Sequence, residues 1–264
     1  MKQWDRIPGR VGSTYLSWAS QTLTNRDWAL LDSVLQLRIA TGRQLERLHF
    51  SDLSGRSRAV VRWRVLKRLV DARLLSTLDQ PAHRRRSAVF EYVLGSAGEW
   101  LARARADGHA HRLVAPGDRY VAHALDITEL YVELVEQLRD QAEELSTFAV
   151  EPAQKDGLGG QLKPDAYLAV RSTNLTDYWW FEIDEQTESL PTIRRKLVTY
   201  LDFLGRSQVG PDGVMPRIMI TVPTAARRGS IQAEIAGLPP PADQLFRVVL
   251  FPDTVGLLLR ILRN

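Results

Sequence analysis

The sequence predicts an α/β protein of two domains, and three observations support this prediction. The chain has 264 residues, enough for two ordinary domains. Residues 1–114 carry 20 Lys and Arg against 10 Asp and Glu, whereas residues 115–264 carry 15 against 21. Helical spacing of apolar residues dominates the first half, and strands alternate with helices in the second. We therefore place the domain boundary near residue 114, in the Gly-, Pro- and His-rich segment 107–118.

The composition excludes several classes of protein. Apolar residues make up 44% and charged residues 25% of the chain, which is typical of a globular protein. No run approaches the ~18 apolar residues that a membrane span needs, so we expect no membrane association. The lack of cysteine excludes disulfides, thiolate metal sites and thiol nucleophiles. The first residues show no signal-peptide pattern, and we expect a cytoplasmic protein.

The first domain is expected at residues 23–114, after a flexible arm at 1–22 that is polar and contains Gly and Pro. A first helix is indicated by Thr24 as N-cap and by apolar residues at helical spacing up to Ile39. A second, shorter helix follows Thr41. A third helix is expected from about residue 56 to 73, with an apolar stripe formed by Ala59, Val60, Trp63, Leu66 and Val70.

The third predicted helix is strongly basic. Only Asp71 offsets its cations, which are Arg56, Arg58, Arg62, Arg64, Lys67 and Arg68. A solvated face is the ordinary role of charge on a helix, but so many cations on one short helix favour a polyanionic partner. Arginine suits this partner because its guanidinium makes bidentate contacts with phosphate and guanine.

A basic hairpin is predicted after this helix. Residues 74–78 and 88–94 indicate two strands, and the turn between them contains His83, Arg84, Arg85 and Arg86. Three helices followed by a basic hairpin are the order of a winged helix-turn-helix, whose third helix enters the major groove while the hairpin contacts phosphates. We therefore expect this domain to bind double-stranded DNA. A winged helix that contacts another protein is the alternative.

The second domain, residues 115–264, is predicted to be an α/β domain with a mixed sheet. Its elements follow the order α-β-β-β-α-β-α-β and close with a short helix. We expect helices at 120–144, 190–204, 224–237 and 254–263, and strands at 146–152, 162–170, 178–184, 216–223 and 244–251.

Three acidic residues stand on the predicted strands of this domain. They are Asp165, Glu182 and Asp184, and Lys196 follows on the next helix. Buried carboxylates are costly unless they are paired or bind a cation. Glu182 and Asp184 share one strand face, which Asp165 can reach if its strand pairs with theirs. This pattern predicts a possible Mg²⁺ site with Lys196 as the supporting cation, since Mg²⁺ prefers oxygen ligands.

These residues carry a resemblance to two groups of proteins. Pro164-Asp165 and the later Glu182-Ile183-Asp184 resemble the PD-(D/E)xK motif of restriction-endonuclease-like folds, with Asp184 where that motif has lysine. Lys196, or Arg194 or Arg195, would then replace that lysine. Over roughly residues 22–250, the basic helix and hairpin and the pattern EIDEQTES…KLVTYLDF resemble the replication-relaxation family. This resemblance implies a DNA-binding protein of actinobacterial plasmids, integrated elements or phages.

Three hypotheses of function follow. The protein could be a DNA-binding protein that acts in replication or its transcriptional control, with the nuclease-like domain used for dimerisation or partner contacts. It could be a Mg²⁺-dependent DNA nuclease or nickase targeted by the winged helix. It could also be an adaptor whose acidic half recruits a replication protein. We expect a homodimer. The net negative charge of residues 115–264 argues against their gripping DNA alone.

Overall fold

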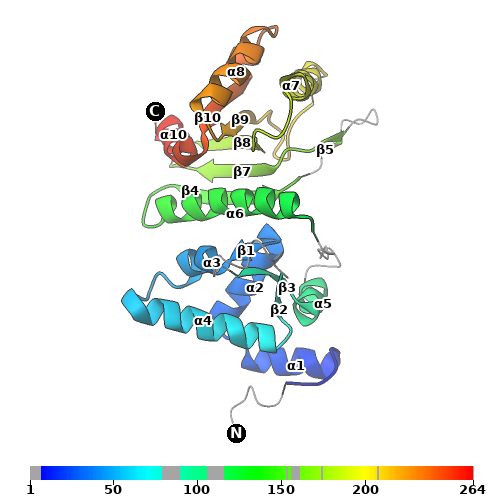
Figure 1. Cartoon of the computed structure of the whole chain (residues 1–264), viewed down its shortest axis with the longest axis vertical. Helices are drawn as coiled ribbons and strands as arrows, with labels where there is room; N and C mark the ends of the chain where they lie inside the picture. Colours follow the sequence, from blue (N-terminus) through cyan, green and yellow to red (C-terminus); the bar gives the residue numbers. More distant parts are fainter. Residues whose placement is uncertain are drawn as a thin grey trace. The chain divides into compact units, whose positions relative to one another are not determined.

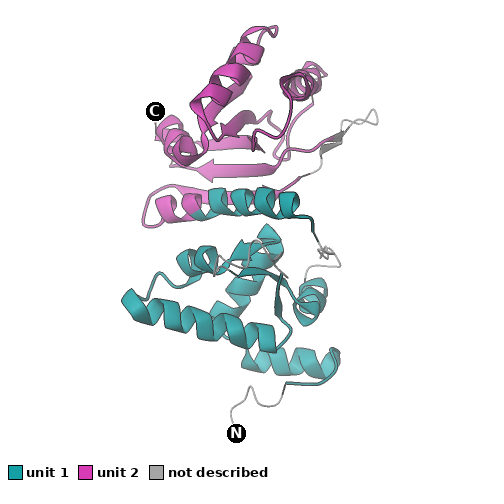
Figure 2. Cartoon of the chain, viewed as in Figure 1, with its two compact units in different colours: residues 1–132 teal, residues 133–264 magenta. Residues whose placement is uncertain are grey.

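The computed structural model describes residues 7–78, 90–105, 116–152, 154–155, 161–173, 175–206 and 208–263. The fold is mixed α/β, as the sequence predicts, and it divides into two compact units, 1–132 and 133–264 (Figure 2). Helix α6 (Asp118–Leu138) contributes residues to both units. Among the described residues, no helix is long and apolar enough to cross a membrane.

Unit 1 combines helices with a small antiparallel sheet in the strand order β1-β3-β2 (Figure 1). Two helices begin with a capping box: Thr24 and Asp27 cap the second helix, and Thr41 and Gln44 cap the third. The elements are α1 (Ser13–Thr22), α2 (Asn25–Leu37), β1 (Ala40–Thr41), α3 (Gly42–His49), α4 (Gly55–Asp71), β2 (Leu75–Thr77), β3 (Glu91–Leu94) and α5 (Ser96–Arg105).

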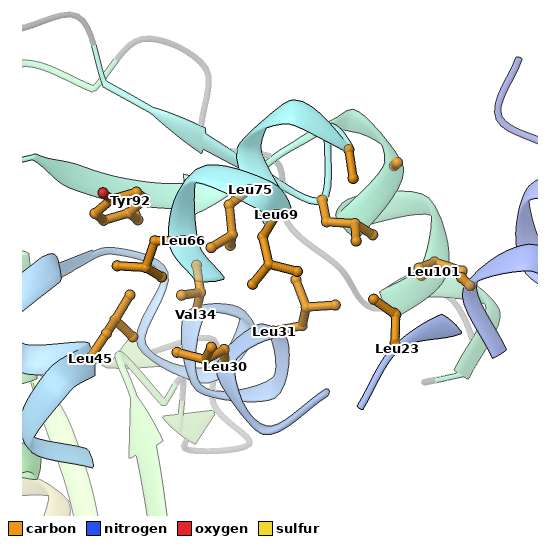
Figure 3. Packing of buried hydrophobic residues seen from close by; sticks show 14 of the residues in the cluster. Leu23, Leu30, Leu31, Val34, Leu45, Leu66, Leu69, Leu75, Tyr92 and Leu101 are labelled. Atoms are coloured by element: carbon orange, nitrogen blue, oxygen red, sulfur yellow. The ribbon is translucent and has the colours of Figure 1, made fainter. Parts of the chain in front are cut away.

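The core of unit 1 lies where α2, α3 and α4 meet the small sheet. Figure 3 shows Leu30 and Val34 of α2, Leu45 of α3 and Leu66 of α4 converging with Tyr92 of β3. All of these side chains are buried, so the three helices and the sheet are held together by one apolar cluster.

Residues 13–22, which we expected to belong to a flexible arm at 1–22, form helix α1 instead. Tyr15 and Ala19 of this helix are fully buried, and the Tyr15 hydroxyl donates a hydrogen bond to the carbonyl oxygen of Ala72 at 2.5 Å. Tyr15, Ala19 and Thr22 recur at helical spacing and form one buried face. The polar composition between them hides this short pattern in the sequence.

The first part of α6 belongs to unit 1, although the sequence places the whole helix after the boundary near residue 114. The Gln44 amide on α3 donates to the Glu129 carboxylate at 2.9 Å and to the Leu125 carbonyl at 3.1 Å. The Thr128 hydroxyl donates to the carbonyl oxygen of Ile39 at 2.7 Å. These buried polar contacts tie the helix to the end of α2 and to α3.

Unit 2 is built on a five-stranded mixed sheet in the order β10-β9-β8-β7-β4 (Figure 1). Strands β8, β9 and β10 run parallel, whereas β7 runs antiparallel to both of its neighbours. The strands are β4 (Glu144–Val150), β7 (Ala166–Arg171), β8 (Thr176–Ile183), β9 (Arg217–Val222) and β10 (Phe246–Leu250). A separate two-stranded sheet pairs β5 (Gln154–Lys155) with β6 (Gln161–Leu162).

Helices α7 (Leu190–Gly205) and α8 (Ala225–Ala236) cover one face of the large sheet (Figure 1). Leu197 and Tyr200 of α7 and Ile231 of α8 pack there against Trp180 of β8 and Ile220 of β9. Side chains alternate along a strand, so Glu182 lies on the same covered face as Trp180. The chain continues through α9 (Ala242–Leu245) and a short 3₁₀ turn (Phe251–Asp253) to α10 (Thr254–Arg263).

Candidate functional site

Helix α4 presents a face different from the one that its sequence suggests. Its buried residues are Leu66 and Leu69, not the full predicted stripe. Val60 and Trp63, which we expected to point inward, are 44% and 58% exposed. Valines occur on several sides of this helix, so apolar spacing alone does not fix which face is buried.

Two of the predicted DNA-contacting arginines on α4 are engaged by helix α3. Arg62 forms an ion pair with the Glu46 carboxylate at 2.7 Å, and the Nε atom of Arg58 lies 3.5 Å from the same carboxylate. Arg58 also donates to the carbonyl oxygen of Glu46 at 3.1 Å. These half-buried cations therefore fasten α4 to α3.

Arg68 is engaged by helix α2. Its guanidinium pairs with Asp27, whose side chain is fully buried. The same carboxylate accepts hydrogen bonds from the backbone N–H and hydroxyl of Thr24 at 2.9 and 2.8 Å, which closes the capping box of α2. Asp27 thus links the start of α2 to α4. Arg68 supplies the positive charge that the buried Asp27 carboxylate requires.

Three other cations of α4 remain on its exposed side. Lys67 pairs with Asp71 one turn later at 2.7 Å, with both side chains more than half exposed. Arg56 and Arg64 are exposed, and within the described parts of the chain no acidic group lies at ion-pair distance from either. Within the described residues, none of these three cations therefore ties α4 to another helix.

The two strands of the predicted hairpin are present. Strands β2 and β3 pair antiparallel, with Ser76 opposite Val93 and Thr77 opposite Tyr92, and β1 joins the other side of β3. His83, Arg84, Arg85 and Arg86 lie outside the described residues.

In unit 2, pairing of β7 with β8 brings Asp165 to Glu182, as the sequence predicts. Ala166 lies opposite Phe181 in the register, and the backbone N–H of Asp165 donates to the carbonyl oxygen of Phe181 at 2.9 Å. The Asp165 carboxylate accepts a hydrogen bond from the N–H of Ile183 at 2.7 Å. Asp165 is therefore fixed at the end of β8.

Glu182 is buried between two donors on α7. The ammonium of Lys196 lies 2.6 Å from one of its carboxylate oxygens, and the hydroxyl of Tyr200 donates to the other. Burial raises the pKa of Glu182 to about 7, and the nearby charge of Asp165 acts in the same direction, while Lys196 and Tyr200 oppose it. Burial and the Glu182 charge together raise the pKa of Tyr200 well above its ordinary value.

Of the three candidate cations on α7, Lys196 is the one that pairs with Glu182. Burial alone would lower its pKa, but the charges of Glu182 and Asp165 outweigh burial and raise it. The other two candidates lie elsewhere: Arg194 binds Glu234 at 3.1 Å, and Arg195 donates to the hydroxyl of Thr192 at 3.3 Å.

Asp184 has a partner that the sequence analysis missed. The guanidinium of Arg227 on α8 donates to both carboxylate oxygens of Asp184, at 2.6 and 2.9 Å, and to the carbonyl oxygen of Glu188 at 2.8 Å. Asp184 and Arg227 are both 8% exposed. This is the bidentate geometry for which arginine is suited. Arg227 lies 43 positions after Asp184, and nothing in the sequence pattern links the two.

The acidic residues do not fit the predicted Mg²⁺ site in this arrangement. Both oxygens of Glu182 and both oxygens of Asp184 accept hydrogen bonds from protein donors. Among the described residues there is no group of three His, Cys, Asp or Glu side chains placed to hold a metal ion. Lys196 and Arg227 supply the positive charge that a metal would bring, and we derive no metal-dependent step.

A small pocket opens beside these pairs. The pocket contains about 330 Å³ of empty space, a volume that includes its part open to solvent. Glu182, Asp184, Glu188, Lys196 and Tyr200 supply its polar lining, and isoleucine and leucine side chains line the rest. The acidic cluster is therefore accessible at one edge, although its carboxylates are paired.

Comparison with known proteins identifies the family. The model of the family described as replication-relaxation matches residues 31–218, which include α4, the hairpin strands and the acidic cluster. The chain belongs to the replication-relaxation family. Membership supports a role in the replication of plasmids or other mobile elements in general.

The other comparisons add little to the replication-relaxation assignment. No curated protein matches the chain. The crystal structure of protein VC1899 from Vibrio cholerae is similar over 90% of this chain and 56% of its own, with 14% sequence identity and a TM-score of 0.35. The chain thus spans little more than half the length of that protein. We draw no argument from a likeness of this size.

Proposed function

We propose that unit 1 is a winged helix that binds double-stranded DNA, and that the protein acts through this binding in the replication of a mobile element or in its transcriptional control. The observation that carries the proposal is the exposed face of α4. Arg56, Arg64 and Lys67 lie on it, while the other cations of this helix are used to hold unit 1 together.

The arrangement of the elements supports this assignment. Helices α2, α3 and α4 are followed by the antiparallel pair β2 and β3, and β1 adds a third strand. In a winged helix the third helix lies in the major groove and the hairpin follows the neighbouring backbone. His83, Arg84, Arg85 and Arg86, which lie outside the described residues, belong to the segment that we propose as the wing.

Unit 2 is assigned a different part in the proposal. Lys196 and Arg227 are paired with the buried carboxylates of Glu182 and Asp184, and residues 115–264 carry a net negative charge. Phosphate neutralisation provides most non-specific affinity for DNA, so this unit is a poor DNA ligand. We assign it to dimerisation or to contacts with a replication protein.

The direct test removes the two exposed arginines. In Arg56→Ala/Arg64→Ala, affinity for duplex DNA from the host element should fall roughly tenfold or more at moderate salt, because two phosphate contacts are lost. The slope of log affinity against log salt should decrease by about 2. Fluorescence anisotropy of a labelled duplex, titrated at several salt concentrations, measures both quantities.

A charge-matched control separates specific contacts from net charge. Arg195 and Arg260 are exposed residues of unit 2, and Arg195→Ala/Arg260→Ala removes the same charge. This variant should bind DNA like the wild type. Equal affinity of both double variants and the wild type would overturn the assignment of α4 as the DNA-contacting helix.

Dimerisation gives a second readout of the proposal. A two-fold symmetric dimer should protect a palindromic site whose half-sites are one helical turn apart, about 34–36 Å. Footprinting of the element's DNA, together with sedimentation of the free protein, tests this. A monomer that protects a single half-site would remove the dimer from the proposal.

A further inference from the structure

Two large apolar side chains occupy the centre of the exposed face of α4. Trp63 is 58% exposed and Val60 is 44% exposed. They lie among the exposed cations at helical spacing: positions 56, 60, 63 and 67 follow one another at intervals of four, three and four residues, and Arg64 adjoins Trp63 on the same side of the helix. The stripe that these positions form is therefore cationic at both ends and apolar in the middle.

Packing within unit 1 does not account for these two side chains. Trp18, Trp28 and Trp100 all pack against the core cluster of this unit, whereas that cluster contains neither Trp63 nor Val60 among the described residues. An exposed indole on a charged helix leaves much apolar area in water. Such exposed area is characteristic of a surface that a partner covers.

The surrounding charge selects the class of partner. Arg56 and Arg64 lack an acidic neighbour within the described residues, and Lys67 has only the exposed Asp71. A surface of this charge is complementary to a polyanion. In duplex DNA the apolar group at base edges in the major groove is the C5-methyl of thymine, and apolar side chains long enough to reach it contact it.

We infer that Trp63 and Val60 contact thymine methyl groups in the major groove and so give the protein a preference for thymine at the base pairs that α4 faces. This inference rests on the proposed function, because it requires α4 to lie in the groove. The neighbouring arginines hold the helix to phosphates and guanines, and the apolar pair distinguishes thymine from bases without the methyl group.

The experiment uses a substitution in the DNA that removes only the methyl group. Duplexes are first selected by the wild-type protein from a random library, and the enriched duplex is then synthesised with thymidine or with deoxyuridine. Uracil pairs as thymine does but has no C5-methyl. Wild type should bind the thymidine duplex roughly three- to fivefold more tightly for each buried methyl group. Val60→Ala/Trp63→Ala should bind the two duplexes equally.

The control variant is Arg56→Ala/Arg64→Ala, which keeps the apolar pair. It should bind both duplexes more weakly and keep the preference for thymidine. Because Val60 and Trp63 are exposed, the apolar variant should fold, and circular dichroism checks this. Single substitutions, Val60→Ala and Trp63→Ala, then divide the preference between the two side chains.

The possible failures are distinguishable. If the wild type enriches no duplex, both the proposed function and this inference fail. If it enriches one but binds the thymidine and deoxyuridine forms equally, the inference fails and DNA binding stands. A thymidine preference that survives in Val60→Ala/Trp63→Ala also overturns the inference.

Discussion

Arg227 in unit 2 and Arg64 in unit 1 show two opposite uses of the same side chain. Arg227 is 8% exposed and binds both carboxylate oxygens of Asp184. Arg64 is exposed on α4, and no acidic group among the described residues lies at ion-pair distance from it. A count of cations therefore does not locate a binding surface. The proposed DNA-binding surface rests instead on the exposed cations of α4 that are not used in internal ion pairs.

The cations of α4 divide in the same way, into those in internal ion pairs and those that are exposed. Arg58 and Arg62 are fastened to Glu46, and Arg68 to the buried Asp27. Their role in holding the helix is distinct from the role of Arg64. Substitutions that break the internal pairs should change the stability of the fold, and substitutions at the exposed cations should change only binding.

The largest effect is expected for Arg227→Ala. It leaves Asp184 buried without its counter-ion, and breaking a buried pair in this way costs roughly 3–5 kcal/mol. Urea unfolding followed by the fluorescence of the buried Trp179 and Trp180 measures the loss. Arg195→Ala, at an exposed position on α7, should change the free energy of unfolding by less than about 0.5 kcal/mol.

A double-mutant cycle sharpens this test. If the cost of Arg227→Ala comes from the unpaired carboxylate, Asp184→Ala/Arg227→Ala should recover part of it. If the effects of the two single substitutions on the free energy of unfolding add in the double variant, the Asp184–Arg227 pair does not stabilise the fold as its geometry indicates. The same follows if Arg227→Ala is as stable as Arg195→Ala.

The second effect concerns pH. The pKa of Glu182 is raised by burial to about 7 from 4.5, so between these values the folded state holds a proton that the unfolded state has lost. The contribution of Glu182 to the free energy of unfolding should therefore fall as pH rises through this window, by roughly 3 kcal/mol. The difference between wild type and Glu182→Gln, measured by urea unfolding at several pH values, isolates this contribution.

The absence of this slope would contradict that interpretation. If the difference between wild type and Glu182→Gln stays constant from pH 5 to 8, the ion pair with Lys196 dominates over burial, and Glu182 is ionised over this whole range in both the folded and the unfolded state. Tyr200→Phe provides a check, because it removes the hydroxyl that opposes the raised pKa of Glu182. It should move the window to higher pH.

A third effect separates Arg68 from Arg64 on one helix. Arg68→Ala removes a charged hydrogen bond to Asp27 and should lower the free energy of unfolding by about 2 kcal/mol. Arg64→Ala should leave stability unchanged and weaken DNA binding. Thermal unfolding and anisotropy on the same samples measure both. Equal stability of the two variants would remove the structural role of Arg68.

Sequence reasoning recovers the elements of this fold better than the partners within it. The strands of unit 2 and the helices α2, α3, α4 and α7 follow from apolar spacing and caps, which are local signals. Apolar spacing wrongly places Val60 and Trp63 on the buried face of α4, because this helix carries valines on several of its sides. Helix α1 was missed because its buried face consists of three residues in a polar segment.

The acidic site shows the same limit. The pairing of β7 with β8 made the approach of Asp165 to Glu182 predictable, and Lys196 was predictable from the next helix. Arg227 was not, because its contact with Asp184 depends on how α8 packs against α7 and the sheet. A burial cost indicates that a carboxylate needs a cation, but it does not indicate which cation.

The smallest effect tests whether Arg227 stands in for a metal. Millimolar Mg²⁺ should leave the unfolding midpoint of the wild type unchanged, since the oxygens of Glu182 and Asp184 already have donors. In Arg227→Ala, Asp184 is released into the pocket that Glu182 and Glu188 also line, and Mg²⁺ should restore up to about 1 kcal/mol. Arg195→Ala should gain nothing. Stabilisation of the wild type, joined by Mg²⁺-dependent nicking of plasmid DNA that Asp165→Ala abolishes, would instead favour the nuclease hypothesis.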